Sequence, residues 1–86
     1  MKMYRVYRAS SKPFLLVRIV APDKETAMII WNRYIKGIFR EAMPINITRN
    51  ESAVFKTGTV PGYYDPFGGF DFVSVARRMK IDHIFS

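Results

Sequence analysis

A chain of 86 residues has room for one hydrophobic core, so we expect a single domain spanning residues 1–86. Hydrophobic residues make up 49% of the chain and aromatic residues 15%, a composition far from that of disordered proteins. The formal net charge of +7 attracts polyanions, and nucleic acid is the commonest polyanion in a cytoplasm.

The composition also indicates the cellular compartment. The chain contains no cysteine, which excludes disulfides and thiolate chemistry and suits a reducing cytoplasm. The longest apolar run, residues 14–21, is interrupted by Arg18 and falls short of the roughly 18–20 residues that span a bilayer. No secretory leader pattern follows Lys2 and Arg5. We therefore expect a cytoplasmic protein, in the host cytoplasm if it is phage-encoded, with no membrane partner.

The first twenty residues predict a β-hairpin. Residues 4–9 and 14–20 are rich in β-prone side chains, and a turn cluster of serine, lysine and proline separates them. Alternation in the first strand separates Tyr4, Val6 and Arg8 from Arg5 and Tyr7. In the second strand it places Leu15, Val17 and Ile19 on one face and Phe14, Leu16, Arg18 and Val20 on the other.

A helix is predicted to follow. Pro22 ends the second strand, and Asp23 is a candidate N-cap. Gly37 offers a C-terminal cap. The apolar residues between them recur at the spacing of a stripe that faces a core, namely Ala27, Ile30, Trp31, Tyr34, Ile35 and Ile38.

The second half of the chain is less periodic. Ile45 and Ile47 alternate with polar residues and predict a third strand, which residues 53–56 extend or rejoin after a turn at residues 50–52. Residues 58–69 are punctuated by glycine and proline around several aromatic side chains, and predict an aromatic loop that is either ordered or flexible.

The last segment has helical spacing. Phe72, Val75, Ala76 and Met79 predict a short second helix behind a cap at Asp71, and residues 81–85 predict a last strand. The fold class that follows is α+β: a small, mainly antiparallel sheet with a strand-strand-helix-strand (ββαβ) core and one main helix packed on it, completed by these C-terminal elements.

Residue types that carry catalysis or bind metal ions are scarce. His83 is the only histidine, and the acidic residues are scattered without paired spacing. The glycines of residues 58–69 are not followed by the lysine-serine or lysine-threonine pair of a phosphate loop. We therefore expect a binding protein rather than an enzyme, with no cofactor, no metal ion and no small-molecule substrate.

Two surfaces are candidates for binding. If the helix covers one face of the sheet, the other face carries arginine among aromatic side chains, unless the C-terminal segment folds back over it. Such a face suits stacking of bases and contact with phosphates, or docking of another protein. Its candidate nucleic-acid-binding residues are Arg5, Tyr7, Phe14, Arg18, Arg77 and Arg78. A second surface is the outer side of the helix, with Arg33, Lys36 and Arg40.

The central part of the chain resembles a class of small phage proteins. Residues 14–21, the helix start at residues 23–27, the aromatic pair Trp31 and Tyr34, and the strand at residues 47–49 are similar to the strand-strand-helix-strand pattern of phage proteins that block host machinery. The phage T7 inhibitor of bacterial RNA polymerase and small anti-CRISPR proteins are examples. The chain departs from the T7 pattern in a longer link between helix and third strand, in Glu51 at the position of a second arginine, and in lacking an acidic surface.

This resemblance implies one contact residue, Arg49. Arg49 lies on the same side of the predicted strand as Ile45 and Ile47, which directs it towards the helix-covered face of the sheet. The long arginine side chain can still reach the edge of that face, so we expect it to be at least partly exposed. The first hypothesis is therefore a non-catalytic, phage-type inhibitor or modulator that docks on a host nucleic-acid-handling complex, such as RNA polymerase or CRISPR machinery. Its partner-binding residues are Arg49, Arg33, Lys36 and Arg40. The alternative is a module that binds DNA or RNA directly through the basic and aromatic sheet face.

Overall fold

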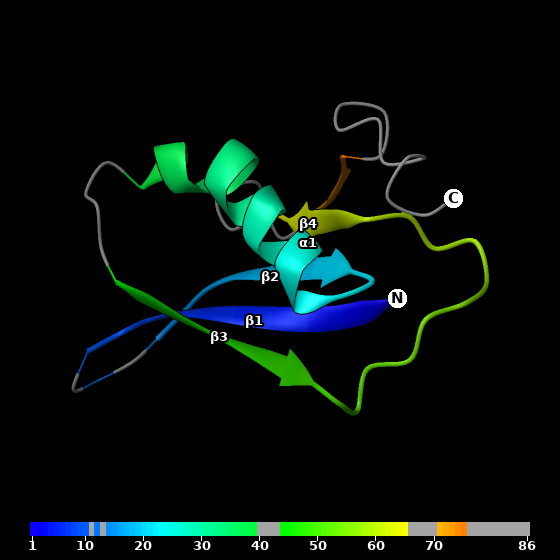
Figure 1. The fold of residues 1–86 in the computed structure, drawn as a ribbon, viewed down its shortest axis with the longest axis horizontal. Coiled ribbons are helices and arrows are strands. Elements are labelled where there is room, and N and C mark those ends of the chain that lie inside the picture. The colour runs from blue at the N-terminus through cyan, green and yellow to red at the C-terminus, as the bar shows by residue number, and fades with distance from the viewer. Residues whose placement is uncertain (11, 13, 40–43, 66–70, 76–86) are drawn as a thin grey trace.

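The fold is α+β, with a helical segment covering one face of an antiparallel sheet (Figure 1). This computed structural model describes residues 1–10, 12, 14–39, 44–65 and 71–75. Within them the sheet has five strands in the order β3-β1-β2-β4-β5. The strands are β1 (Lys2–Arg8), β2 (Leu15–Ala21), β3 (Ile45–Asn50), β4 (Gly62–Tyr64) and β5 (Phe72–Ser74).

The predicted hairpin of β1 and β2 is confirmed, but a β-bulge changes its facing pattern. Val6 pairs with Val17, whereas the next residue, Tyr7, pairs with Leu15, so Leu16 is the extra residue. Leu16 is buried in the core cluster, while Leu15 is 42% exposed. The alternation prediction, which placed Leu15 with Val17 and Ile19 and placed Leu16 opposite them, was therefore wrong at the bulge.

The helix begins as predicted. The backbone N–H of Thr26 donates a 2.7 Å hydrogen bond to Oδ1 of Asp23, which satisfies one of the free donors of the first turn. The segment then changes its winding, because α1 (Lys24–Ile30) continues as a π-helical turn, η1 (Trp31–Ile35), and a 3₁₀ turn, η2 (Lys36–Ile38).

The change of winding explains one deviation from the predicted stripe and one from the predicted cap. Trp31 is buried as expected and stacks on Phe39 with ring centroids 5.7 Å apart, but Ile38 is 41% exposed because a regular 3.6-residue period no longer holds there. Gly37 lies inside η2 and is not the predicted cap; the segment ends where Phe39 adopts an extended backbone.

One cluster of buried side chains joins the sheet to the helical segment. Burial of this apolar surface supplies most of the free energy of folding. The cluster consists of Tyr4, Val6, Leu16, Val17, Ile19, Ala21, Ala27, Ile30, Trp31, Ile35, Tyr63 and Val75.

The third strand is confirmed, and it pairs with the outer side of β1. Ile45 and Ile47 are half-buried, whereas Asn46 and Thr48 are exposed. The predicted turn after it is closed by Asn50, whose Oδ1 accepts hydrogen bonds from the N–H and Oγ of Ser52. Residues 53–56 are not in the sheet, so the prediction that they extend or rejoin it was wrong.

The remaining strands differ from the sequence prediction. β4 lies inside the predicted aromatic loop, and β5 replaces the start of the predicted second helix. Gly62 explains part of this pairing, because a Cβ there would lie 2.6 Å from Cζ of Phe72 and closer still to the carbonyl oxygen of Val73. The rest of the predicted helix, with Ala76 and Met79, and the predicted last strand at residues 81–85 lie outside the described residues.

The ββαβ description therefore covers only part of the architecture. The chain order strand-strand-helix-strand holds as far as β3, but β4 and β5 widen the sheet on its other side. No helix in the described part of the chain is long and apolar enough to cross a membrane.

Candidate functional site

The strand register places a row of arginine and aromatic side chains across the sheet. Side chains directly opposite one another on paired strands point to the same face. The row runs from β3 to β5 through Thr48, Arg5, Arg18, Tyr64 and Phe72.

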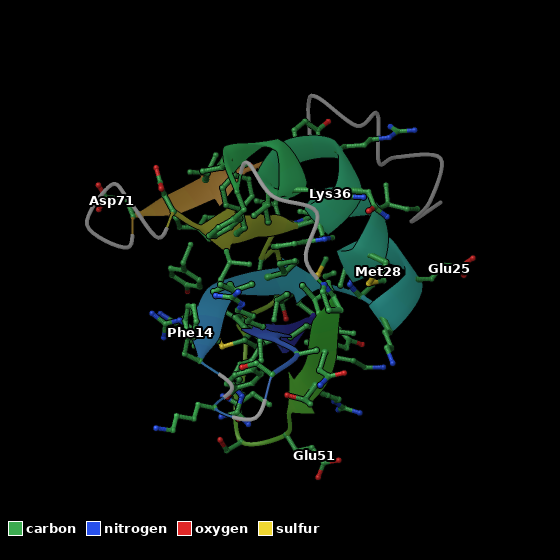
Figure 2. All side chains as sticks on the ribbon, turned by 90° about the vertical axis from the view of Figure 1, so that its left-hand side faces the viewer. Phe14, Glu25, Met28, Lys36, Glu51 and Asp71 are labelled. Carbon is green, nitrogen blue, oxygen red and sulfur yellow. The ribbon has the colours of Figure 1, made fainter. Side chains whose placement is uncertain are left out.

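This row lies on the side of the sheet opposite α1. Tyr4 and Val6, which alternate with Arg5 along β1, are buried in the cluster that contains the helix residues. We call the opposite side the distal face. Figure 2 shows Phe14 on that side of the sheet, away from Glu25 and Met28 of α1.

Two arginines occupy paired positions in the row. Arg5 and Arg18 are directly opposite one another on the paired strands β1 and β2, an arrangement that is destabilising for like charges. The side chain of Arg5 is half-buried, and its Nε is buried without a hydrogen-bond partner among the described residues. A buried donor without a partner also costs free energy. The fold therefore maintains two unfavourable features at one point of the distal face.

Aromatic rings continue the row beyond Arg18. The guanidinium carbon of Arg18 lies 5.0 Å from the ring centroid of Tyr64, within the range of a cation–π interaction. The ring of Tyr64 meets that of Phe72 edge to face at 5.4 Å, and Phe72 is 40% exposed. Asp65 and Asp71 are joined by a 2.9 Å backbone hydrogen bond at the ends of β4 and β5. The row residues on these two strands, Tyr64 and Phe72, are uncharged, so the positive charge of the row lies on β1 and β2.

The connection from β3 to β4 forms a pocket beside this row. It leaves the β3 edge and passes the start of β1 and the end of β2 before it reaches β4 (Figure 1). The pocket has a volume of about 400 Å³ and is lined by Val20, Tyr64 and Phe72 of the sheet and by Val54, Phe55, Lys56 and Thr59 of the connection.

A tight turn shapes the pocket wall. The N–H and Oγ1 of Thr59 both donate to the carbonyl oxygen of Lys56, at 3.2 and 2.7 Å. Gly58, at φ 90°, adopts the left-handed conformation that this turn requires and that other residues avoid. The expected cover of the distal face by the C-terminal segment concerns residues outside the described part, but residues 54–59 line one part of that face.

Sequence reasoning found some of these residues and missed others. Arg5 and Arg18 were predicted for this face, as was Tyr7, which pairs with Asn46 and Leu15 and is half-buried. The pocket residues of the connection were missed because no periodic pattern marks them. The only signal for β4 was the pair of tyrosines at positions 63 and 64.

The other predicted residues do not join the row. Phe14 is 52% exposed and lies at the hairpin end, where the guanidinium carbon of Arg8 is 6.0 Å from its ring centroid. Arg33 and Lys36 are exposed on η1 and η2, and Figure 2 shows Lys36 with the helical segment. Three further predicted residues, Arg40, Arg77 and Arg78, lie outside the described residues.

Arg49 is exposed, as predicted, and belongs to the helix-covered side. It pairs with Tyr4, whose pKa is raised above its ordinary value by burial and by the Asp23 carboxylate, while the charge of Arg49 acts in the opposite direction. The two candidate binding surfaces therefore lie on opposite sides of the sheet, so substitutions can test them separately.

Among the described residues no three histidine, cysteine, aspartate or glutamate side chains are grouped in a way that could hold a metal ion. Comparison with protein-family models, with curated proteins and with solved structures gives no significant match.

Proposed function

We propose that this protein is a non-catalytic module that binds nucleic acid directly through the distal face. The observation that supports this proposal most strongly is the unbroken row of Arg5, Arg18, Tyr64 and Phe72 across four paired strands. It combines phosphate-binding cations with rings on which bases stack, the two components of sheet platforms that bind nucleic acid.

The arginine pair has a physical reason to attract a polyanion. Arg5 and Arg18 bring two positive charges to paired positions of the distal face, and a phosphate group bound there can accept charge-assisted hydrogen bonds from both guanidinium groups. Arginine suits this role because its planar guanidinium matches the geometry of phosphate oxygens. The net charge of +7 adds a longer-range attraction that weakens with salt.

Docking on a host nucleic-acid-handling complex is the second candidate function. The observation that favours it is the exposure of Arg49, the one residue implied by the resemblance to phage inhibitors, together with exposed Arg33 and Lys36 on η1 and η2. In this proposal the exposed cations of the helix-covered side contact the partner protein, and the arginine pair of the distal face is not required.

Fluorescence anisotropy with a labelled random 20-nucleotide single strand tests the first proposal. We expect binding that weakens steeply between 50 and 200 mM salt, with a log-log slope of about −0.7 for each phosphate contact. Arg5→Gln should lower the affinity and reduce the steepness of that slope by about one contact.

Arg33→Gln is the matched control, because it removes the same charge from an exposed position of η1. It should leave the slope nearly unchanged. Absence of binding at 50 mM salt would refute the proposal, as would an equal loss in the Arg5 and Arg33 variants.

Arg49→Ala tests the second candidate. If Arg49 is a contact for a host protein, the substitution should weaken that complex by about 2 kcal/mol, as expected for an interface hot spot. The melting temperature should hardly change, because the side chain is exposed. A destabilised variant that still captures the host protein would make Arg49 structural and remove the support for this candidate.

A further inference from the structure

We infer that the nucleic acid bound by the distal face is single-stranded, and that one unstacked base enters the pocket between residues 54–59 and strands β4 and β5. This inference rests on the proposed function and specifies its ligand. It concerns a pocket that shares Tyr64 and Phe72 with the row and is otherwise formed by other residues.

The pocket has the size and the walls for a flat aromatic group. Its volume of about 400 Å³ lies within the range of roughly 300–1,000 Å³ typical of small-molecule sites. Phe72 is the more exposed ring of the Tyr64–Phe72 pair, and Phe55 lines the pocket from the connection. Rings with exposed surface are the groups on which single-stranded bases stack.

An exposed apolar side chain marks the same place. Val54 is 92% exposed, although it belongs to the lining of the pocket. A base seated against Val54 and Phe72 would remove apolar surface from water on both sides of its ring. Binding in the pocket is therefore more favourable for a planar ligand than for a solvated phosphate alone.

Cations next to the pocket favour a nucleotide over an uncharged ring. Lys56 is in the lining, and Arg18 lies over Tyr64, with Arg5 on the next strand. A nucleotide carries a flat ring and an anion on one short sugar link, so the ring can stack while the phosphates reach these cations. In a duplex the faces of the bases are stacked on their neighbours, and only a single strand offers them to a pocket without the cost of opening the helix.

A decathymidine with one central 2-aminopurine tests the inference, because stacking on an aromatic ring changes the fluorescence of that base. We expect a change on binding to the wild-type protein and much weaker binding of the same sequence as a duplex. Phe72→Ala should abolish the fluorescence change and weaken binding by about 5- to 150-fold, the factor that corresponds to loss of one base stack.

Phe14→Ala is the matched control, since Phe14 is an exposed phenylalanine at the hairpin end, outside the pocket lining. It should retain the fluorescence change. A second variant avoids any effect on folding: Val54→Glu places a carboxylate on a fully solvated side chain beside the pocket and should weaken binding. Ile38→Glu, which places a carboxylate on an exposed apolar side chain of the helical segment, should not weaken binding.

The outcomes separate this inference from the proposed function. If the wild-type protein binds no oligonucleotide at low salt, both are overturned. If it binds with salt dependence but without a fluorescence change, or binds duplex equally well, only the inference is overturned. Displacement of the oligonucleotide by an acidic, tyrosine-containing peptide at equal concentration would assign the pocket to a protein ligand and would also overturn the inference.

Discussion

Replacing Arg5 by methionine should stabilise the protein while it weakens binding. Arg5 lies directly opposite Arg18, and its Nε is buried without a hydrogen-bond partner among the described residues. Methionine keeps an unbranched stem of similar length but carries neither the charge nor the buried donor. The substitution therefore removes two unfavourable features and retains most of the packing along the strand.

The size of the effect follows from these two features. A buried polar group without a partner costs about 1–3 kcal/mol. Like charges directly opposite on paired strands cost roughly 0.2–1 kcal/mol. Some packing is lost, so we expect Arg5→Met to raise the free energy of unfolding by about 1–3 kcal/mol. In a domain of this size each 1 kcal/mol raises the melting temperature by about 4–8 °C.

Urea and thermal unfolding of three proteins measure this effect: the wild type, Arg5→Met and Arg33→Met. The Arg33 variant removes the same charge from an exposed site and should change stability by less than about 0.5 kcal/mol. Saturating single-stranded oligonucleotide, at about 100 times the dissociation constant, should stabilise the wild type by about 2.7 kcal/mol and the Arg5 variant by much less. A destabilised Arg5→Met protein would show that the guanidinium supports the fold and would refute this reasoning.

Three further substitutions test the fold. Trp31→Ala should cost about 3–5 kcal/mol, measured by urea unfolding, because the ring is buried against the sheet and stacks on a second ring. Gly62→Ala should cost about 1–3 kcal/mol in the same assay, because its Cβ would collide with Phe72 and the adjoining backbone. Asp23→Ala should cost about 1 kcal/mol at pH 7, since it removes the cap of α1. Hydrogen bonds from Thr26 lower the pKa of the Asp23 carboxyl, so its contribution to stability is present above the pKa of the unfolded chain, near 4, and is lost as pH falls through the lower folded value.

Each of these predictions has a control or an opposing outcome. An unchanged melt in Trp31→Ala would show that the helical segment does not pack as described. Gly37→Ala is the control for Gly62, because nothing lies within 4 Å of its added Cβ and its φ is not positive; it should leave stability unchanged or raise it slightly. For Asp23, a cost that persists unchanged at pH 2 would mean that the carboxylate does not act as the cap.

Local signals in the sequence predicted the first half of the fold. Proline followed by aspartate marks the start of α1, and the spacing of Ala27 and Trp31 identifies its buried side. β1 and β2 were found because each contains a run of β-prone residues next to a turn cluster. These features depend on residues close together in the chain, so one sequence suffices to detect them.

Features set by distant contacts could not be predicted in this way. β4 and β5 have three residues each and form because they pair with β2 and with one another. Phe72 and Val75 have helical spacing, but packing of Phe72 on Tyr64 and across Gly62 favours a strand. The bulge at Leu16 likewise depends on the partner strand and breaks simple alternation.

In the candidate site too, features set by local signals could be predicted and features set by distant contacts could not. Arg5 and Arg18 could be assigned to one face because strand parity is a local property. That they are direct neighbours depends on the hairpin register, and the pocket depends on where residues 54–59 lie against Val20 and Tyr64. Neither the register nor the path of this connection follows from residue type alone.

The most direct test of the account follows the Nε–Hε resonances of the arginine side chains by nuclear magnetic resonance while a decathymidine is added. The two surfaces carry different arginines, with Arg5 and Arg18 on the distal face and Arg33 and Arg49 elsewhere. Binding through the distal face predicts that the resonances of Arg5 and Arg18 shift in proportion to occupancy, while those of Arg33 and Arg49 stay in place. Shifts confined to Arg33 and Arg49, with Arg5 and Arg18 unaffected, would contradict the proposal that the distal face binds nucleic acid.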